Sequence, residues 1–325
     1  MIITNKHNLP LSIGVWLMRD EYDYDPTAIS ATSLLKPIKQ MILSGRAPTK
    51  ALQMDLADMI ASRMGTALHS AIEQAWEDPE LADVLEMLHL TKETAANFVI
   101  NPETVEEGQI PIYMEQRVYG EVEGQKISGK YDFISGGVLE DFKSTSVYSY
   151  LLGDKEEKFA LQGSIYRYLD PEKITEDYMR ITYIFTDWQK SQVGVKENYP
   201  TSRVKSVEIP LMDITETEEF IGNKIRQIRQ FKNAPESALP RCSDEELWRK
   251  SAVYKYYSNP DKTTGRSTKN FDDLASAYRF KAEKGKGIVI EVKGQVIACR
   301  YCRGAVICEQ KNEYLLDGSL ILDEV

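Results

Sequence analysis

The chain has 325 residues, of which 42% are hydrophobic and 28% charged, as in an ordinary globular protein large enough for one domain or a core with a smaller addition. No apolar run approaches the roughly 20 residues that span a bilayer and no signal-peptide pattern opens the chain, which argues against a membrane protein and predicts a cytoplasmic one. The net charge of −10 does not exclude nucleic acid, because residues 241–311 hold 15 Lys and Arg against 9 Asp and Glu, while the remainder holds 25 against 41.

Two helices are predicted in the first quarter of the chain. Residues 29–43 favour a helix, which Ser30 or Thr32 would cap at its N-terminus. Residues 50–76 carry apolar side chains at every third or fourth position, which is the period of one helical face. The Asp78-Pro79 pair would end this second helix.

Strand patterns occupy the chain between residues 110 and 143. Three short runs, 112–119, 126–134 and 138–142, are rich in strand-forming residues and are separated by glycine-containing turns. Because consecutive strands joined by tight turns pair with each other, these runs predict a meander of three strands.

The rest of the chain alternates helix and strand. We expect a helix at 155–169, strands at 178–185 and 204–209, and an amphipathic helix at 214–231. Pro235 and Pro240 mark a boundary, so we expect a core with N-terminal helices at 1–235 and a second segment at 236–325. That segment is expected to contain helices at 244–257 and 271–284 and a hairpin through Gly294. The order of elements predicts a mixed α/β fold.

The most informative segment runs from Ser128 to Thr145. Asp132 ends one expected strand and Asp141 ends the next, so their carboxylates can converge on one hard divalent cation. Lys143 lies two residues after Asp141 and therefore points to the same face of an extended strand. A carboxylate that holds a metal and an ammonium that steadies the water or the phosphate suit phosphodiester hydrolysis. For this triplet alone, a solvated ion pair on a surface hairpin is the commoner explanation.

Two further features favour the catalytic interpretation. His69 is one of only three histidines, and an imidazole beside two carboxylates suits Mg²⁺ or, because of its nitrogen, Mn²⁺. Gln162 and Tyr166 share one face of the helix after the Asp141 strand, where they would line the site or contact DNA. The alternatives are an ordinary helical histidine and plain helix packing.

Four motifs occur in a family-like order: Gly65-x-x-x-His69, Gly129-x-x-Asp132, Asp141-x-Lys143 and Gln162-x-x-x-Tyr166. Together they resemble the RecB-like branch of the PD-(D/E)xK nuclease superfamily, over residues 29–185 or about half of the chain. The resemblance implies a restriction-endonuclease-like core, in which a central mixed sheet is flanked by helices.

The same resemblance assigns roles to individual residues. It implies metal ligands at His69, Asp132, Asp141 and the carbonyl of Phe142, with Glu115 as a further acidic candidate. It implies that Lys143 is the catalytic lysine and that Gln162 and Tyr166 shape the substrate channel.

All four cysteines lie downstream of these motifs, at Cys242, Cys299, Cys302 and Cys308. Four thiolates suit Zn²⁺ or an iron–sulfur cluster, and free buried cysteines are the other option. The C-x2-C-x5-C spacing resembles that of AddB-type nucleases with a [4Fe–4S] cluster, although their solitary cysteine precedes the core and Cys242 follows it. A Pro-x-Cys-Ser-Asp-Glu-Glu segment ahead of a cysteine cluster also resembles phage-encoded nucleases. The resemblance implies a small C-terminal metal subdomain with a [4Fe–4S] cluster, or with Zn²⁺ as the alternative.

Basic and aromatic residues alternate between positions 247 and 286. Such a mixture is typical of grooves that bind single-stranded nucleic acid, where cations meet phosphates and rings stack on bases. A solvated helical face with ordinary core aromatics explains the pattern equally well.

These observations favour a metal-dependent deoxyribonuclease that hydrolyses phosphodiester bonds by metal-activated water. We expect an exonuclease or end-processing enzyme of recombination, repair or phage DNA metabolism, in a bacterial or phage-infected cell. A catalytically silent DNA-binding or assembly subunit and an endonuclease acting on duplex DNA are the alternatives, and RNA as substrate stays open. Expected partners are single-stranded DNA or duplex ends, and a helicase or a recombinase or annealing protein; the sequence predicts no oligomeric state.

Overall fold

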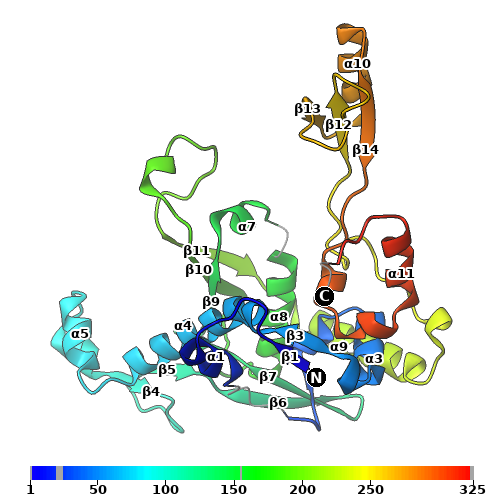
Figure 1. The fold of residues 1–325 in the computed structure, drawn as a ribbon. Helices are drawn as coiled ribbons and strands as arrows, with labels where there is room; N and C mark the ends of the chain where they lie inside the picture. Colours follow the sequence, from blue (N-terminus) through cyan, green and yellow to red (C-terminus); the bar gives the residue numbers. More distant parts are fainter. Residues whose placement is uncertain (1, 20–24, 154–155, 323–325) are drawn as a thin grey trace. The chain divides into compact units, whose positions relative to one another are not determined.

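The computed structural model describes residues 2–19, 25–153 and 156–322 (Figure 1). The chain divides into two compact units. The core unit comprises Ile2–Leu35 and Gln53–Arg226, and the cysteine unit comprises Lys36–Leu52 and Gln227–Val325. Within the described ranges, every helix is too short or too polar to cross a lipid bilayer.

A six-stranded mixed sheet forms the centre of the core unit, in the order β11-β10-β9-β8-β5-β4. Its strands are β4 (Phe98–Ile100), β5 (Ile110–Met114), β8 (Phe133–Ser135), β9 (Val138–Thr145), β10 (Tyr178–Phe185) and β11 (Val204–Pro210). The pairs β9–β10 and β4–β5 are parallel, and the other three pairs are antiparallel. The chain passes from β9 to β10 through α7 (Val147–Leu151) and α8 (Glu156–Leu169).

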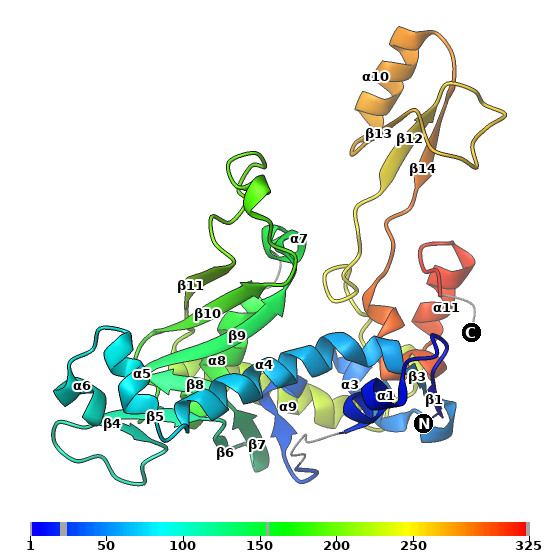
Figure 2. The ribbon, with the colours of Figure 1, turned by 60° about the vertical axis from the view of Figure 1, so that its left-hand side comes forward.

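Helices cover both faces of this sheet (Figure 2). On one face α4 (Ile60–Trp76) brings the ring of Trp76 within 5.2 Å of that of Phe133, measured between centroids. On the other face α8 and α9 (Ile214–Phe231) contribute Ile165 and Ile221 to the main apolar core, together with Leu139 of β9. The predicted mixed α/β fold, with a central mixed sheet between helices, is confirmed.

Smaller elements complete the core unit. They are β1 (Ile2–Thr4), α1 (Leu11–Met18), β2 (Ile29–Ser30), α2 (Ala31–Leu34), β3 (Gln53–Asp55), α5 (Leu81–Met87), α6 (Lys92–Ala96), β6 (Arg117–Val122) and β7 (Gln125–Lys130). The strands β2, β7 and β6 form a second sheet, and β1 pairs with β3 in parallel.

The cysteine unit is built around two small apolar clusters and a separate sheet. Its elements are α3 (Ile38–Arg46), β12 (Val253–Tyr257), β13 (Lys269–Phe271), α10 (Leu274–Lys284), β14 (Ile288–Val292) and α11 (Glu309–Leu316). The sheet order is β13-β12-β14, with all pairs antiparallel.

The two N-terminal helix predictions are only partly correct. Ser30 does cap a helix, because its hydroxyl accepts a hydrogen bond from the Ser33 N–H, but that helix is the short α2. Pro37 then separates α2 from α3, so residues 29–43 are not one helix. The expected helix at 50–76 begins only at Ile60, because Asp55 accepts backbone hydrogen bonds that hold β3 and the turn after it.

The C-terminal predictions also need correction. The expected helix at 244–257 is wrong, because Val253–Tyr257 form strand β12. The glycine at position 294 does not turn a hairpin; instead it lets the chain pass the backbone of Lys250, whose oxygen would lie 1.6 Å from an added Cβ. The predicted helix at 271–284 is confirmed from Leu274 onward, and the strand at 178–185 has the predicted bounds.

Candidate active site in the core unit

The predicted three-strand meander is confirmed in its antiparallel pairing, but its first two strands are each broken and divided between two sheets, and these breaks create the site. The chain breaks between β5 and β6 at Glu115, which has a φ of +52°, and between β7 and β8 at Asp132. The two breaks face each other, because the Glu115 N–H donates to the Asp132 carbonyl oxygen at 3.1 Å. The chain therefore passes between the six-stranded sheet (β5, β8) and the three-stranded sheet (β6, β7) at both breaks. The carboxylates of Glu115 and Asp132 lie at this junction of the two sheets.

Helix α4 brings His69 to this point. The Nδ1 atom of His69 lies 3.4 Å from Oδ1 of Asp132 and 3.9 Å from Oε1 of Glu115. The ligand atoms of these three residues all lie within 4.8 Å of one another, which is close enough for one metal ion to bind them together. Meanwhile the Nε2–H of His69 donates to the carbonyl of Phe142 at 2.9 Å, which fixes the orientation of the ring.

Strand β9 supplies the aspartate and the lysine. Oδ2 of Asp141 lies 2.5 Å from Nζ of Lys143, as expected for side chains on one face of a strand. The Asp141 side chain is 7% exposed and contacts that of Asp132 through a hydrogen bond. Its Oδ2 atom meets Lys143 as an ion pair and has no hydrogen bond of regular geometry among the described residues.

The charges of the site are balanced by protons. The hydrogen bond with Asp132 raises the pKa of His69 to about 9, so at neutral pH the imidazolium donates from both nitrogens. Burial raises the pKa of Asp132, but the hydrogen bond from His69 and the positive charges of His69 and Lys143 together outweigh it, so the pKa is lowered. Burial raises the pKa of Asp141 to about 7, against the opposing charge of Lys143. The positive charge of protonated His69 thus compensates the carboxylate of Asp132, as a bound divalent ion would do.

The structure brings most of the predicted ligands together. Among the residues it describes, the group within 4.8 Å contains Glu115 beside His69 and Asp132, while Asp141 lies behind Asp132 and pairs with the lysine. The Phe142 carbonyl accepts from His69, so its role as a ligand stays a prediction. One neighbour is not identified by the sequence: the Nζ atom of Lys130 lies 2.6 Å from Oε2 of Glu115.

Gln162 and Tyr166 contact each other on helix α8. The Gln162 amide donates to the Tyr166 hydroxyl at 3.0 Å, and the Tyr166 ring is buried in the main core. That ring rests on Gly129 of β7, where an added Cβ would lie 2.7 Å from Cδ1 of Tyr166. The glycine of the Gly129-x-x-Asp132 motif thus serves close packing, and a role of Gln162 and Tyr166 in a substrate channel stays a prediction.

The two motif glycines should respond in opposite ways to alanine. Gly129→Ala is expected to lower the free energy of unfolding by about 1–3 kcal/mol, because the Tyr166 ring must move. Gly65→Ala is the matched control: Gly65 lies on helix α4, and an added Cβ would lie 4.0 Å from its nearest neighbour, Oγ of Ser144, so alanine should stabilise by up to about 1 kcal/mol. Urea denaturation of both variants measures the difference, and equal effects would contradict this account of Gly129.

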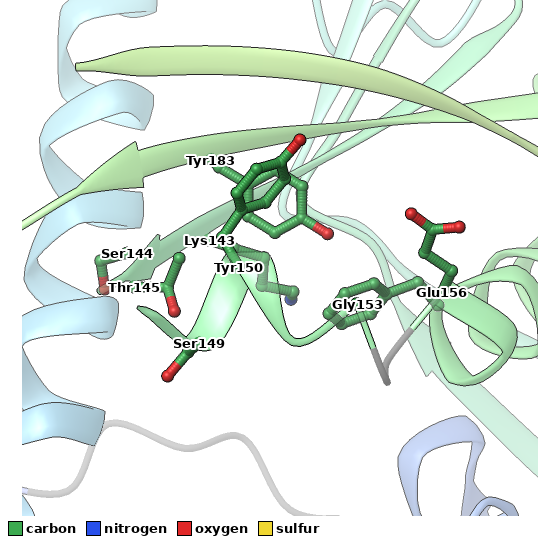
Figure 3. Close-up of a pocket in the computed structure, with 9 residues that line it drawn as sticks. Lys143, Ser144, Thr145, Ser149, Tyr150, Gly153, Glu156 and Tyr183 are labelled. Atoms are coloured by element: carbon green, nitrogen blue, oxygen red, sulfur yellow. The ribbon is translucent and has the colours of Figure 1, made fainter. Parts of the chain in front are cut away.

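A pocket of about 110 Å³ adjoins the lysine (Figure 3). Its walls come from the end of β9, from α7, α8 and β10. The lining residues are Lys143, Ser144, Thr145, Ser149, Tyr150, Gly153, Glu156, Phe159 and Tyr183. The rings of Tyr150 and Tyr183 lie 5.0 Å apart between centroids, so one side of the pocket is aromatic while other walls offer hydroxyl groups.

The four cysteines are half-buried thiols of the cysteine unit. Cys242 and Cys299 pack against a cluster that contains Leu247 and Tyr314, and Cys308 packs against the cluster of α3. Burial raises the pKa of Cys242 to about 12 and that of Cys299 to about 11, and the other sulfurs add to both shifts. The four sulfurs therefore lie within electrostatic range of one another, yet no three of them lie within 4.8 Å among the described residues.

Comparison with known proteins gives little further support. No family model matches the chain, and no curated protein does. The crystal structure of SSO0001 aligns with a TM-score of 0.40 at 14% identity, over 69% of this chain and 85% of that one. A phage-related exonuclease from Haemophilus somnus 129PT aligns with a TM-score of 0.27 at 13% identity, over 62% and 95%. Both similarities are too weak to support a function, so the function must be inferred from the geometry of the site.

Proposed function

We propose that the protein is a metal-dependent deoxyribonuclease. The observation that carries this proposal is the convergence of His69, Glu115 and Asp132 beside the Asp141–Lys143 pair, at a point where two sheets part. Nitrogen and carboxylate ligands around one ion, with an ammonium beside them, suit hydrolysis of a phosphodiester.

The residues present fit a divalent ion. Nδ1 of His69 and the facing carboxylates of Asp132 and Glu115 would hold it, and the carboxyl group of Asp141, which is ion-paired with Lys143, would complete the acidic surroundings. The nitrogen ligand favours Mn²⁺ over Mg²⁺. When bound, such an ion lowers the pKa of water and polarises a phosphoryl oxygen.

The side chains around the ion would position the substrate. The ammonium of Lys143 is held next to Asp141 and borders the pocket, where it would bind a non-bridging phosphate oxygen or orient the attacking water. The tyrosines and hydroxyls of the pocket would receive the nucleotide next to the scissile phosphate. We further propose an exonuclease or end-processing role in recombination, repair or phage DNA metabolism, with a helicase or annealing protein as partner.

The proposal is tested with purified protein, Mn²⁺ and two forms of one plasmid. End-labelled linear DNA is expected to be degraded, and covalently closed circular DNA is expected to survive, because an end-processing enzyme requires a free end. Cleavage of the circle would show an endonuclease instead. Binding to both forms without metal-dependent cleavage of either would overturn the nuclease proposal in favour of a silent DNA-binding subunit.

We also propose that the four cysteines form a second site, which binds a [4Fe–4S] cluster. Zinc with bonds of about 2.3 Å would need its four sulfurs about 3.8 Å apart, closer than the structure places them. A polynuclear cluster, in which each cysteine binds a different iron, needs wider spacing.

A further inference from the structure

Residues 251–293 form an arm within the cysteine unit. The chain leaves and returns at one point, where the Lys250 N–H donates to the Gln295 oxygen at 2.9 Å. Between these positions β12 and β14 pair as a ribbon, β13 adds a third strand, and α10 packs on the sheet (Figure 1 and Figure 2). The arm contains nine Lys and Arg against five Asp and Glu, in a chain whose net charge is −10.

A ring cluster makes the arm rigid. Tyr256 of β12 is 1% exposed, and its ring contacts that of Phe280 on α10 at 5.1 Å between centroids. Phe280 in turn contacts Phe271 of β13 at 5.3 Å. The helix begins at an Asp273 cap and ends at Gly285 in the left-handed conformation. The side chains on this surface are therefore presented from a fixed frame.

Two lysines lie over the ring cluster, and a third lies over an exposed tyrosine of α10. Nζ of Lys269 lies 4.8 Å from the Phe280 centroid, and Nζ of Lys284 lies 5.2 Å from the same ring. Nζ of Lys281 lies 5.7 Å from the centroid of Tyr278, which is 51% exposed. Among the residues that the structure describes, no acidic side chain lies within 4 Å of any of these three ammonium groups.

Like charges held together without counter-ions repel one another, and an external polyanion relieves that repulsion. We propose that the arm binds DNA through its sugar-phosphate backbone, with Lys269, Lys281 and Lys284 as the contacts. The inference rests on the proposed function for the identity of the polyanion. It adds a binding surface separate from the residues that would cut the strand, and it predicts strongly salt-dependent affinity.

The test measures binding without cleavage. Fluorescently labelled duplex DNA is titrated with the full-length protein in EDTA at several salt concentrations. The triple variant Lys269→Gln, Lys281→Gln, Lys284→Gln is expected to bind roughly 10- to 100-fold more weakly at about 50 mM salt. The slope of log K against log salt should fall by about 1 for each lysine lost.

The control removes the same charge elsewhere. The triple variant Lys6→Gln, Lys92→Gln, Lys232→Gln changes three exposed lysines outside the arm and should bind nearly as the parent does. Equal affinities and slopes for the two triple variants would overturn the inference while leaving the nuclease proposal intact. Arm-dependent binding by a protein that never cleaves would support the inference and overturn the nuclease proposal instead.

Discussion

Replacing Lys143 with methionine is expected to reduce Mn²⁺-dependent DNA cleavage by roughly 10²- to 10³-fold while leaving Mn²⁺ binding almost unchanged. The ammonium of Lys143 contacts Asp141 but belongs to no group of candidate ligands, so its loss removes stabilisation of the reacting phosphate rather than the ion. Asp141 has a pKa of about 7 and can take up a proton, so the variant should fold. Cleavage of end-labelled DNA and titration of bound Mn²⁺ measure the two effects separately.

Two comparison variants make this result specific. Asp132→Asn should lose both the ion and the activity, because Asp132 faces His69 at the centre of the ligand group. Lys190→Met removes an exposed lysine elsewhere in the core unit and should change neither. A folded Lys143→Met protein with parental activity would contradict the assignment of the lysine.

Local patterns in the sequence predict the regular parts of the fold. The alternation in residues 178–185 and the helical spacing in 214–231 correspond to β10 and α9. The same alternation passes unbroken through Glu115 and Asp132, where the chain changes sheet. A change of partner strand depends on contacts distant in sequence, and the positive φ of Glu115 has no signature in its residue type.

The wrong helix at 244–257 has a local cause. Ser243 and Glu246 form a reciprocal capping box, since the Ser243 N–H donates to Glu246 and the Glu246 N–H to the Ser243 hydroxyl. This helix-start signal is real, but a single turn ends at Trp248, whose φ is +49°. The β-branched and aromatic residues of Val253–Tyr257 favour a strand, and in the structure this strand preference prevails over the helix-start signal.

The candidate site was predictable in composition but not in arrangement. Motif order indicated that His69, Asp132, Asp141 and Lys143 belong together, and the structure places them in one group of contacts. The motif order did not indicate that Glu115 would lie beside His69, or that Lys130 would form an ion pair with Glu115. Those relations depend on how two breaks in pairing face each other.

Replacing Cys302 with serine is expected to remove the proposed metal centre and to destabilise the cysteine unit by several kcal/mol. Two small clusters stabilise this unit, one around α3 that includes Cys308 and one that includes Cys242 and Cys299. A metal centre bound by cysteines of both clusters would connect the two clusters. The free energy of metal binding, about 10–16 kcal/mol for structural zinc sites, then contributes to the free energy of folding. Iron, sulfide and zinc content, visible absorbance and thermal unfolding of anaerobic preparations measure the loss.

Ala305→Ser is the matched control, because it adds a hydroxyl to the same turn and keeps all four thiols. Equal iron and sulfide in the parent would identify the cluster, and stoichiometric zinc would identify the alternative. A parent protein without bound metal that unfolds at the same temperature as Cys302→Ser would contradict a metal centre. Since the predicted Mn²⁺ ligands all belong to the core unit, Cys302→Ser should still bind Mn²⁺, which separates a structural role of the cysteines from a catalytic one.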